Sequence, residues 1–197
     1  MPPAPRRSHA ERTQRSRDAL TAAAARLFAA EGFAGTSTEA VLAEAGLTRG
    51  ALYHHFRDKR DLFDAVCQRL HAEAAAAIEQ AAAAPSDPVH ALVAGGLAFV
   101  DQMARPEALR ILLVEAPSVL GWARWNEIDR AHGFGLLVEG VDEAVAAGAL
   151  AGDPEVLAHL LNGALNQAVV WAAQSGEPKA MDRVRTGFRQ MLEALRV

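Results

Sequence analysis

The residues best suited to chemistry lie between positions 36 and 56, and they suit hydrogen bonding to another molecule rather than bond breaking. A short segment of helical apolar spacing leads to Ala45-Gly46-Leu47, and the sequence L-T-R-G-A-L-Y-H-H-F then runs from Leu47 to Phe56. Because glycine tolerates a positive φ, two short helices can meet at a steep angle at this point. The pattern predicts a helix-turn-helix unit whose second helix can enter a major groove.

Helical spacing divides the second helix into a core face and an exposed face. Leu47, Leu52 and Phe56 are expected in the core. Tyr53 and His55 have an alternative, which is packing against the first helix of the chain, predicted over residues 13–31. The remaining face carries donors and small side chains that allow close approach to base edges: Thr48, Arg49, Gly50, Ala51, Tyr53, His54 and His55.

No combination of nucleophile, base and acid indicates a catalytic site, and we expect no metal and no cofactor. His54 and His55 are adjacent, so on a helix they point about 100° apart and do not form a metal-binding pair. His71 and Glu73 add no sensible ligand set. The single cysteine, Cys67, excludes a disulfide framework and is expected to be a small buried hydrophobe rather than a redox sensor.

The elements that position these residues are predicted to be helices, so the expected fold class is all-α. The 197 residues are rich in alanine, include one tyrosine and show no long apolar-polar alternation. Thr36 and Glu39 have capping-box spacing, which places a helix start there. The expected helices span residues 13–31, 36–45, 48–55, 59–84, 88–104, 106–116, 120–148, 154–175 and 178–196.

The net charge of -4 is unevenly distributed along the chain. Residues 1–70 hold 11 basic and 8 acidic side chains, whereas residues 71–197 hold 9 and 16. We expect residues 1–12 to form a disordered basic arm, which is either a nucleic-acid contact or a solvated leader. No apolar segment follows its arginines and no run approaches the length of a membrane span, so neither a signal peptide nor membrane association is expected.

The sequence resembles the TetR family of bacterial transcription regulators. The resemblance is carried by G-F-x-x-T-S at 32–37, A-G-L-T-R-G-A-L-Y-H-H-F at 45–56 and D-K-R-D-L-F at 58–63. It implies a DNA-binding domain over residues 13–58 and a ligand-binding and dimerisation domain over residues 59–197, linked by the helix 59–84.

The resemblance also implies individual roles in DNA binding. Arg49, Gly50 and Tyr53 match positions that usually face bases, and arginine suits bidentate recognition of guanine. His54 could serve either bases or backbone, and Arg12, Arg15 and Arg17 could reach along the backbone. Positions that usually lie against phosphates are matched by Thr38, Thr48, Ala51, His55 and Lys59.

The C-terminal part has aromatic and polar residues that could line a small-molecule pocket. An apolar cavity with a few polar anchors is what such a pocket requires, although aromatic residues at helical spacing are more often core. Glycines within the expected helices weaken them and either leave space or kinks or mark close helix crossings: Gly95, Gly96, Gly133, Gly135 and Gly163. The candidate ligand-binding residues are Phe99, Met103, Leu112, Trp122, Trp125, Phe134, Asn162, Asn166 and Trp171.

With these features, the resemblance implies a cytoplasmic, ligand-responsive regulator, a repressor that binds a near-palindromic operator on double-stranded DNA as a homodimer. The helices 154–175 and 178–196 are the expected dimer interface, and a partly apolar small-molecule effector is expected to release the DNA. Two alternatives remain at this stage. One is a helical interaction protein that has lost DNA binding, and the other is an all-α enzyme.

Overall fold

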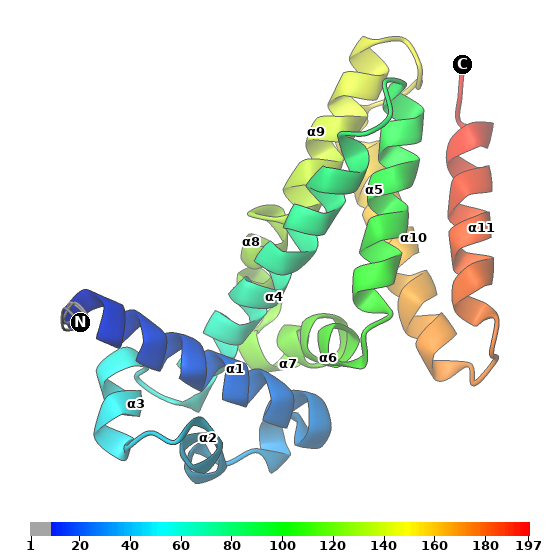
Figure 1. The fold of residues 1–197 in the computed structure, drawn as a ribbon. Helices are drawn as coiled ribbons and strands as arrows, with labels where there is room; N and C mark the ends of the chain where they lie inside the picture. Colours follow the sequence, from blue (N-terminus) through cyan, green and yellow to red (C-terminus); the bar gives the residue numbers. More distant parts are fainter. Residues whose placement is uncertain (1–8) are drawn as a thin grey trace, which may run out of the picture. The chain divides into compact units, whose positions relative to one another are not determined.

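The computed structural model describes residues 9–197 and shows an all-α protein, with no strand in that range (Figure 1). The chain divides into two compact units, Met1–Val66 and Cys67–Val197. This boundary at 66/67 differs from the expected one at 58/59. The reason is that the first turns of α4 (Lys59–Ala82) contribute the fully buried Leu62, Phe63 and Val66 to the first unit.

Helix α1 (His9–Gly35) begins earlier than expected. Residues 9–12, assigned to a disordered arm from the sequence, are helical in the structure. The rest of the arm, with Arg6 and Arg7, lies outside the described residues. Near its end α1 is kinked at Gly32, whose φ of 79° is a left-handed value that favours glycine.

Three further helical segments complete the first unit: α2 (Thr38–Ala45), α3 (Arg49–His55) and the start of α4. Their apolar faces surround a core in which the rings of Phe28, Phe33 and Phe63 contact one another with centroids 5.1 to 5.8 Å apart. Such aromatic contacts add to the energy of apolar burial. On the surface, Arg26 of α1 pairs with Glu44 of α2 at 2.6 Å.

The cap of α2 corrects the capping box expected at Thr36. The N-cap residue is Ser37, whose hydroxyl accepts a hydrogen bond from the backbone N–H of Ala40 at 3.0 Å. Thr36 is buried and its hydroxyl donates to the carbonyl of Gly32 at 2.8 Å. Thr36 therefore closes the kink of α1, and the cap falls one residue later.

The second unit is a bundle of helices that includes the remainder of α4. In it α9 packs on α10 and α5, and α11 packs on α5 and α10. The expected helix 120–148 is interrupted at Gly121, with φ of 81°, and again at residues 131–132. The elements are α5 (Pro88–Met103), α6 (Pro106–Ala108), η1 (Leu109–Glu115), α7 (Ala116–Leu120), α8 (Trp122–Arg130), α9 (Gly133–Ala146), α10 (Pro154–Gln174) and α11 (Ala180–Ala194).

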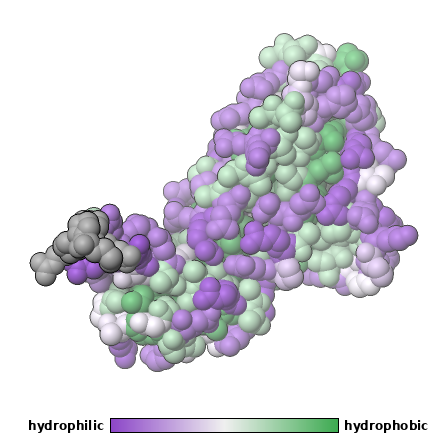
Figure 2. Space-filling view, in the orientation of Figure 1, coloured by the Kyte–Doolittle hydropathy of each residue, from purple (hydrophilic) through white to green (hydrophobic). Residues whose placement is uncertain are grey.

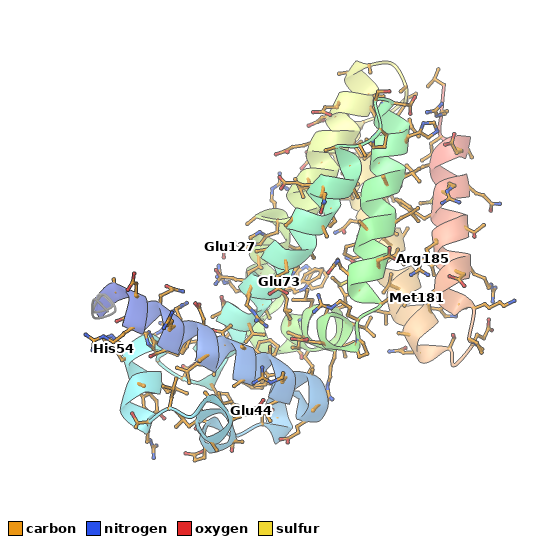
Figure 3. All side chains as sticks on the ribbon, in the orientation of Figure 1. Glu44, His54, Glu73, Glu127, Met181 and Arg185 are labelled. Carbon is orange, nitrogen blue, oxygen red and sulfur yellow. The ribbon has the colours of Figure 1, made fainter. Side chains whose placement is uncertain are left out.

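Two glycines in this unit mark close helix crossings. A Cβ added to Gly96 of α5 would lie within 2.9 Å of three atoms of the Phe188 ring of α11, and one added to Gly140 of α9 would lie 2.9 Å from Leu92. Gly163, in contrast, has no such neighbour within 4 Å. Beside the first crossing, Arg185 of α11 pairs with Asp101 of α5 at 2.6 Å (Figure 3).

Helix α10 is the one described helix whose length and composition would allow it to cross a membrane. Polar residues interrupt its apolar sequence, among them Asn162, Asn166 and Gln167. Helices that pack in the core of a protein can have the same length and composition. Five residues of α10 are buried against the bundle: Ala158, Leu161, Leu165, Val169 and Ala172.

Candidate DNA-binding surface and ligand cavity

The turn before α3 determines which side chains of that helix are presented to the outside. Gly46 adopts a left-handed conformation, with φ of 65°, and caps α2 through its backbone N–H. Leu52 and Phe56 are buried as expected, so the opposite face of α3 is open. Thr48, Arg49, Gly50, Tyr53 and His54 are exposed, and Ala51 and His55 are half-buried.

Arg49 and Tyr53 lie one helical turn apart and form a pair on this open face. The guanidinium carbon of Arg49 lies 5.6 Å from the centroid of the Tyr53 ring, and Tyr53 is 48% exposed. A cation held over an aromatic face is a favourable contact that also restricts the arginine. The two side chains therefore form one surface. The Arg49 guanidinium is a hydrogen-bond donor that is already held in place, and the Tyr53 ring is the apolar part.

Thr38 and Glu39 begin α2 beside this pair. The Thr38 hydroxyl donates to the Glu39 carboxylate at 3.1 Å. Hydrogen bonds from the backbone and from Thr38, with a smaller attraction from Arg49, lower the pKa of Glu39. Glu39 is thus an anion at neutral pH, which does not favour a phosphate contact at that position.

Lys59, at the start of α4, is engaged within the first unit. Its ammonium donates hydrogen bonds to the carbonyls of Phe33 at 2.7 Å and Thr36 at 2.9 Å, and it lies 4.4 Å from the Phe33 ring centroid. Two of its three N–H groups are thereby used. Lys59 holds the corner between α1 and α2 in addition to any role toward DNA.

A second cation, Arg17 of α1, lies at the end of α3. Arg17 of α1 donates to the carbonyl of His55 at 3.4 Å and lies 4.7 Å from the Phe56 ring centroid. Partial burial, followed by the charges of His54 and Arg17, lowers the pKa of His55. His54 projects into solvent (Figure 3), and Arg12 and Arg15 are exposed on α1.

The second unit contains a cavity of about 320 Å³ between α4, α5, α9 and α10. Figure 2 shows apolar side chains gathered over the face where α4, α5 and α9 lie in Figure 1, bordered by hydrophilic ones. Of the nine ligand-binding candidates, Phe99, Phe134 and Asn162 line this cavity. Its other lining residues are mostly aliphatic or glycine, with Asp129 as a buried acidic one.

Asp129 belongs to a polar cluster with His71 and Asn162. The Asn162 amide donates to one Asp129 oxygen at 3.2 Å, while Nδ1 of His71 lies 3.9 Å from the other. Burial raises the pKa of Asp129 to about 6. Burial, with a smaller effect of His132 stacked against it, lowers the pKa of His71 to about 4, so His71 is neutral at pH 7.

The other six ligand-binding candidates do not line this cavity. Met103 and Leu112 are fully buried in the core. Trp122 is 64% exposed and stacks on Trp125 at 4.8 Å. Asn166 donates to the Asn162 side chain at 3.4 Å. Trp171 lines a separate groove of about 320 Å³ between α10 and α11.

Trp125 has a structural partner that follows from the π-helical turn η1. In this turn the N–H of Ala116 bonds to the carbonyl of Ile111, five residues earlier. The corresponding donor for the Leu112 carbonyl would be residue 117, which is a proline without an N–H. The Trp125 indole donates to Leu112 instead, at 2.8 Å, and so satisfies that buried carbonyl.

Sequence reasoning missed Asp129 as a cavity residue, although a signal for it exists. Trp125, Ile128 and Asp129 have helical spacing of i, i+3 and i+4, and all three are buried on one face of α8. A carboxylate within such an apolar stripe indicates either a buried pair or a site. Among the described residues no group of three or more His, Cys, Asp or Glu side chains could hold a metal ion.

Comparisons with known proteins match both units. A family model described as bacterial regulatory proteins, tetR family, matches residues 20–66. A second model, described as a tetracyclin repressor-like C-terminal domain, matches residues 89–195, more than half of the chain.

The chain is also similar to individual proteins. The solved structure of a TetR-family transcriptional regulator from Pectobacterium atrosepticum is 32% identical, covers 97% of this chain and 98% of its own, and has a TM-score of 0.79. The HTH-type transcriptional regulator AcrR of Shigella flexneri is 35% identical over 42% of this chain and 39% of AcrR. The HTH-type transcriptional repressor BepR of Brucella suis is 31% identical over 54% of this chain and 51% of BepR. The chain thus matches about half or less of these two curated relatives.

Proposed function

Because the chain belongs to the TetR family of bacterial transcription regulators, we propose that it is a ligand-responsive repressor that binds a near-palindromic operator as a homodimer. The observation that carries the proposal is the open face of α3. It presents donors and small residues on a helix held by buried Leu52 and Phe56 after a left-handed glycine. This is what a helix needs in order to read a major groove.

Within this proposal Arg49 reads guanine through its two-pronged guanidinium, with Tyr53 holding it in place and offering its own ring to a thymine methyl. Gly50 and Ala51 let the backbone approach the bases. The phosphate backbone lies against Thr38, Thr48, Ala51, His55 and the remaining N–H of Lys59, and His54 serves either bases or backbone. These contacts set register and affinity rather than sequence preference.

The dimer is proposed to form through α10 and α11. Leu160 and Trp171 are large apolar side chains that stay exposed on α10, at 65% and 41%, although five other residues of the helix are buried. Trp171 also lines the groove between α10 and α11. A two-fold dimer would place two α3 helices about one DNA turn, roughly 34–36 Å, apart.

The effector is proposed to occupy the cavity lined by Phe99, Phe134, Asn162 and Asp129. Helix α4 supplies Ile78 and Ala82 to the cavity lining and Leu62 to the core of the first unit. An effector that binds one arrangement of α4 better than another would shift the population of dimers competent for the operator. The protein would act in the cytoplasm, without catalysis.

Selection of bound sequences from random or genomic DNA fragments by the purified protein tests this function. The proposal expects enrichment of one near-palindrome, bound with a stoichiometry of one dimer per site. Binding that enriches no sequence would refute it and would favour a helical interaction protein.

A further inference from the structure

The cavity in the second unit has a one-sided charge. Four carboxylate side chains are among its lining residues: the buried Asp129 and the more exposed Glu79, Glu139 and Glu143. No lysine, arginine or histidine is among the described residues that line it. A bound anion would therefore meet only like charges, whereas a cation would meet an attractive field from the mouth inward.

Asp129 is the acid for which this asymmetry matters most, because water does not screen it as it screens exposed acids. It is 8% exposed and accepts a hydrogen bond from the neutral amide of Asn162. The closest histidine, His71, lies beyond hydrogen-bond distance at 3.9 Å and is held neutral by its own burial. A buried carboxylate that lacks a cationic partner is energetically costly, and a ligand cation would offset that cost.

Two basic side chains contact the aromatic wall of the cavity at Phe134. Arg130 lies 5.9 Å from the ring centroid of Phe134, and the ring of His159 lies 4.8 Å from it. Both residues are exposed, and neither is a lining residue of the cavity. Their contacts are with the Phe134 ring, and the groups that shift the pKa of Asp129 do not include them.

We propose that the effector is an apolar molecule bearing one cationic nitrogen, with that nitrogen at Asp129 and the apolar body against Phe99, Phe134 and Leu137. This inference rests on the proposed function, because it names the chemical class of the effector for that cavity. A volume of about 320 Å³ lies at the small end of ligand pockets, so a compact amine suits it better than a long acyl chain.

The test uses three probes that share a phenylbutyl body and differ in charge: 4-phenylbutylamine, 4-phenylbutan-1-ol and 4-phenylbutanoate. Binding to the full-length protein is measured by calorimetry at pH 8, where Asp129 is ionised. A hydrogen-bonded charge pair corresponds to about tenfold or more in Kd, so the amine should bind at least about tenfold more tightly than the alcohol, and the acid most weakly. Asp129→Asn should remove the preference for the amine and leave the affinity for the alcohol within about threefold.

Glu127→Gln is the matched control, since Glu127 is an exposed acid on the outer face of α8 and does not line the cavity (Figure 3). It should keep the preference for the amine. An amine that binds no more tightly than the alcohol, or a preference that survives Asp129→Asn, would overturn the inference. Failure of the proposed function is separate, because it would appear as absent operator selection while calorimetry still reports the amine.

Discussion

The Lys59 ammonium lies between the ring of Phe33, 4.4 Å from its centroid, and the Phe33 carbonyl, 2.7 Å away. A second carbonyl, that of Thr36, completes its contacts at 2.9 Å. One cation at the start of α4 thus joins the end of α1 to the corner that precedes α2. A residue suggested by the sequence to touch phosphate therefore also stabilises the DNA-reading unit.

Lys59→Met should weaken binding to all DNA sequences alike and also destabilise the first unit. The loss of one phosphate contact should flatten the slope of log affinity against log salt by about one unit. The substitution also removes the charged hydrogen-bond donor of two carbonyls, which should lower the free energy of local unfolding by about 1–3 kcal/mol. Salt-dependent mobility shifts measure the first effect and hydrogen exchange over residues 9–66 the second. Unchanged exchange rates would contradict the role at the corner.

Arg49→Ala should remove sequence preference while leaving binding to unrelated DNA nearly unchanged. A bidentate contact to guanine is worth about 1–3 kcal/mol, so affinity for the selected site should fall by roughly 10- to 100-fold. Mobility shifts with the selected sequence and a scrambled one provide the comparison. Arg105→Ala, which removes an exposed arginine of the second unit, should change neither value. Full retention of operator affinity by Arg49→Ala would exclude Arg49 as a base contact.

Leu160→Glu should convert the dimer to a monomer and reduce operator affinity with it. Leu160 is 65% exposed on α10, so the substitution should not disturb the fold of the unit. Sedimentation velocity gives the oligomeric state. Val114→Glu makes the same chemical change at an exposed apolar residue of η1, and it should leave the dimer intact. A dimeric Leu160→Glu variant would place the interface elsewhere.

Gly96→Ala should destabilise the second unit, because its methyl group would overlap the Phe188 ring. Overpacking of this kind costs about 1–3 kcal/mol. Urea unfolding followed by tryptophan fluorescence reports this unit, because Trp122, Trp125 and Trp171 all lie in it. In a double-mutant cycle, Phe188→Leu should recover part of the loss. Additive effects of the two substitutions would show that the crossing can relax without that contact.

Asp129→Asn should stabilise the second unit at pH 8 and have little effect near pH 4. Burial raises the pKa of Asp129 from 3.8 to about 6. The folded state therefore keeps this proton to a higher pH than the unfolded state, and stability falls as the pH rises from 3.8 to 6 and remains lower above it. This pKa shift corresponds to a loss of about 3 kcal/mol in the free energy of unfolding. Asparagine has no proton to lose, so the substitution should restore that stability.

Urea unfolding of both proteins at several pH values measures that difference. His71 acts in the opposite direction, since its pKa is lowered to about 4 and stability is lost as the pH falls from 6.5 to 4. Because His71 is present in both proteins, its effect is common to them. The control Glu127→Gln should show no such pH-dependent gain in stability. If Asp129→Asn gave the same gain at pH 8 as at pH 4, the assignment would be contradicted.

The DNA-reading unit was largely predictable from the sequence because its signals are local. The left-handed turn at Gly46 and the buried Leu52 and Phe56 follow from residue type and helical spacing, and the structure has them as expected. The capping residue was misplaced by one position because Thr36 and Ser37 both have suitable hydroxyls. The two are distinguished only by the kink at Gly32. The Thr36 hydroxyl donates to the carbonyl of Gly32 there, and the hydroxyl of Ser37 caps α2.

The ligand cavity was less predictable because it depends on how distant helices meet. Trp125 and Phe134 are both aromatic residues in helical segments, yet one satisfies a buried carbonyl and the other lines the cavity. Sequence spacing does not distinguish these outcomes. The sequence has no proline at the break at residues 131–132 of the helix expected over 120–148, and the nearby Gly133 and Gly135 indicated a possible kink without deciding that the helix ends there.

The π-helical turn η1 has a consequence for the alignment of this chain with its relatives. Such a turn accommodates one residue more than an α-helical turn between the same flanking helices. A relative that is one residue shorter between positions 109 and 115 can keep those helices with an ordinary α-helical register. If that relative also has a residue other than proline at the position of Pro117, the carbonyl equivalent to that of Leu112 regains a backbone donor, and the tryptophan at position 125 is free to vary.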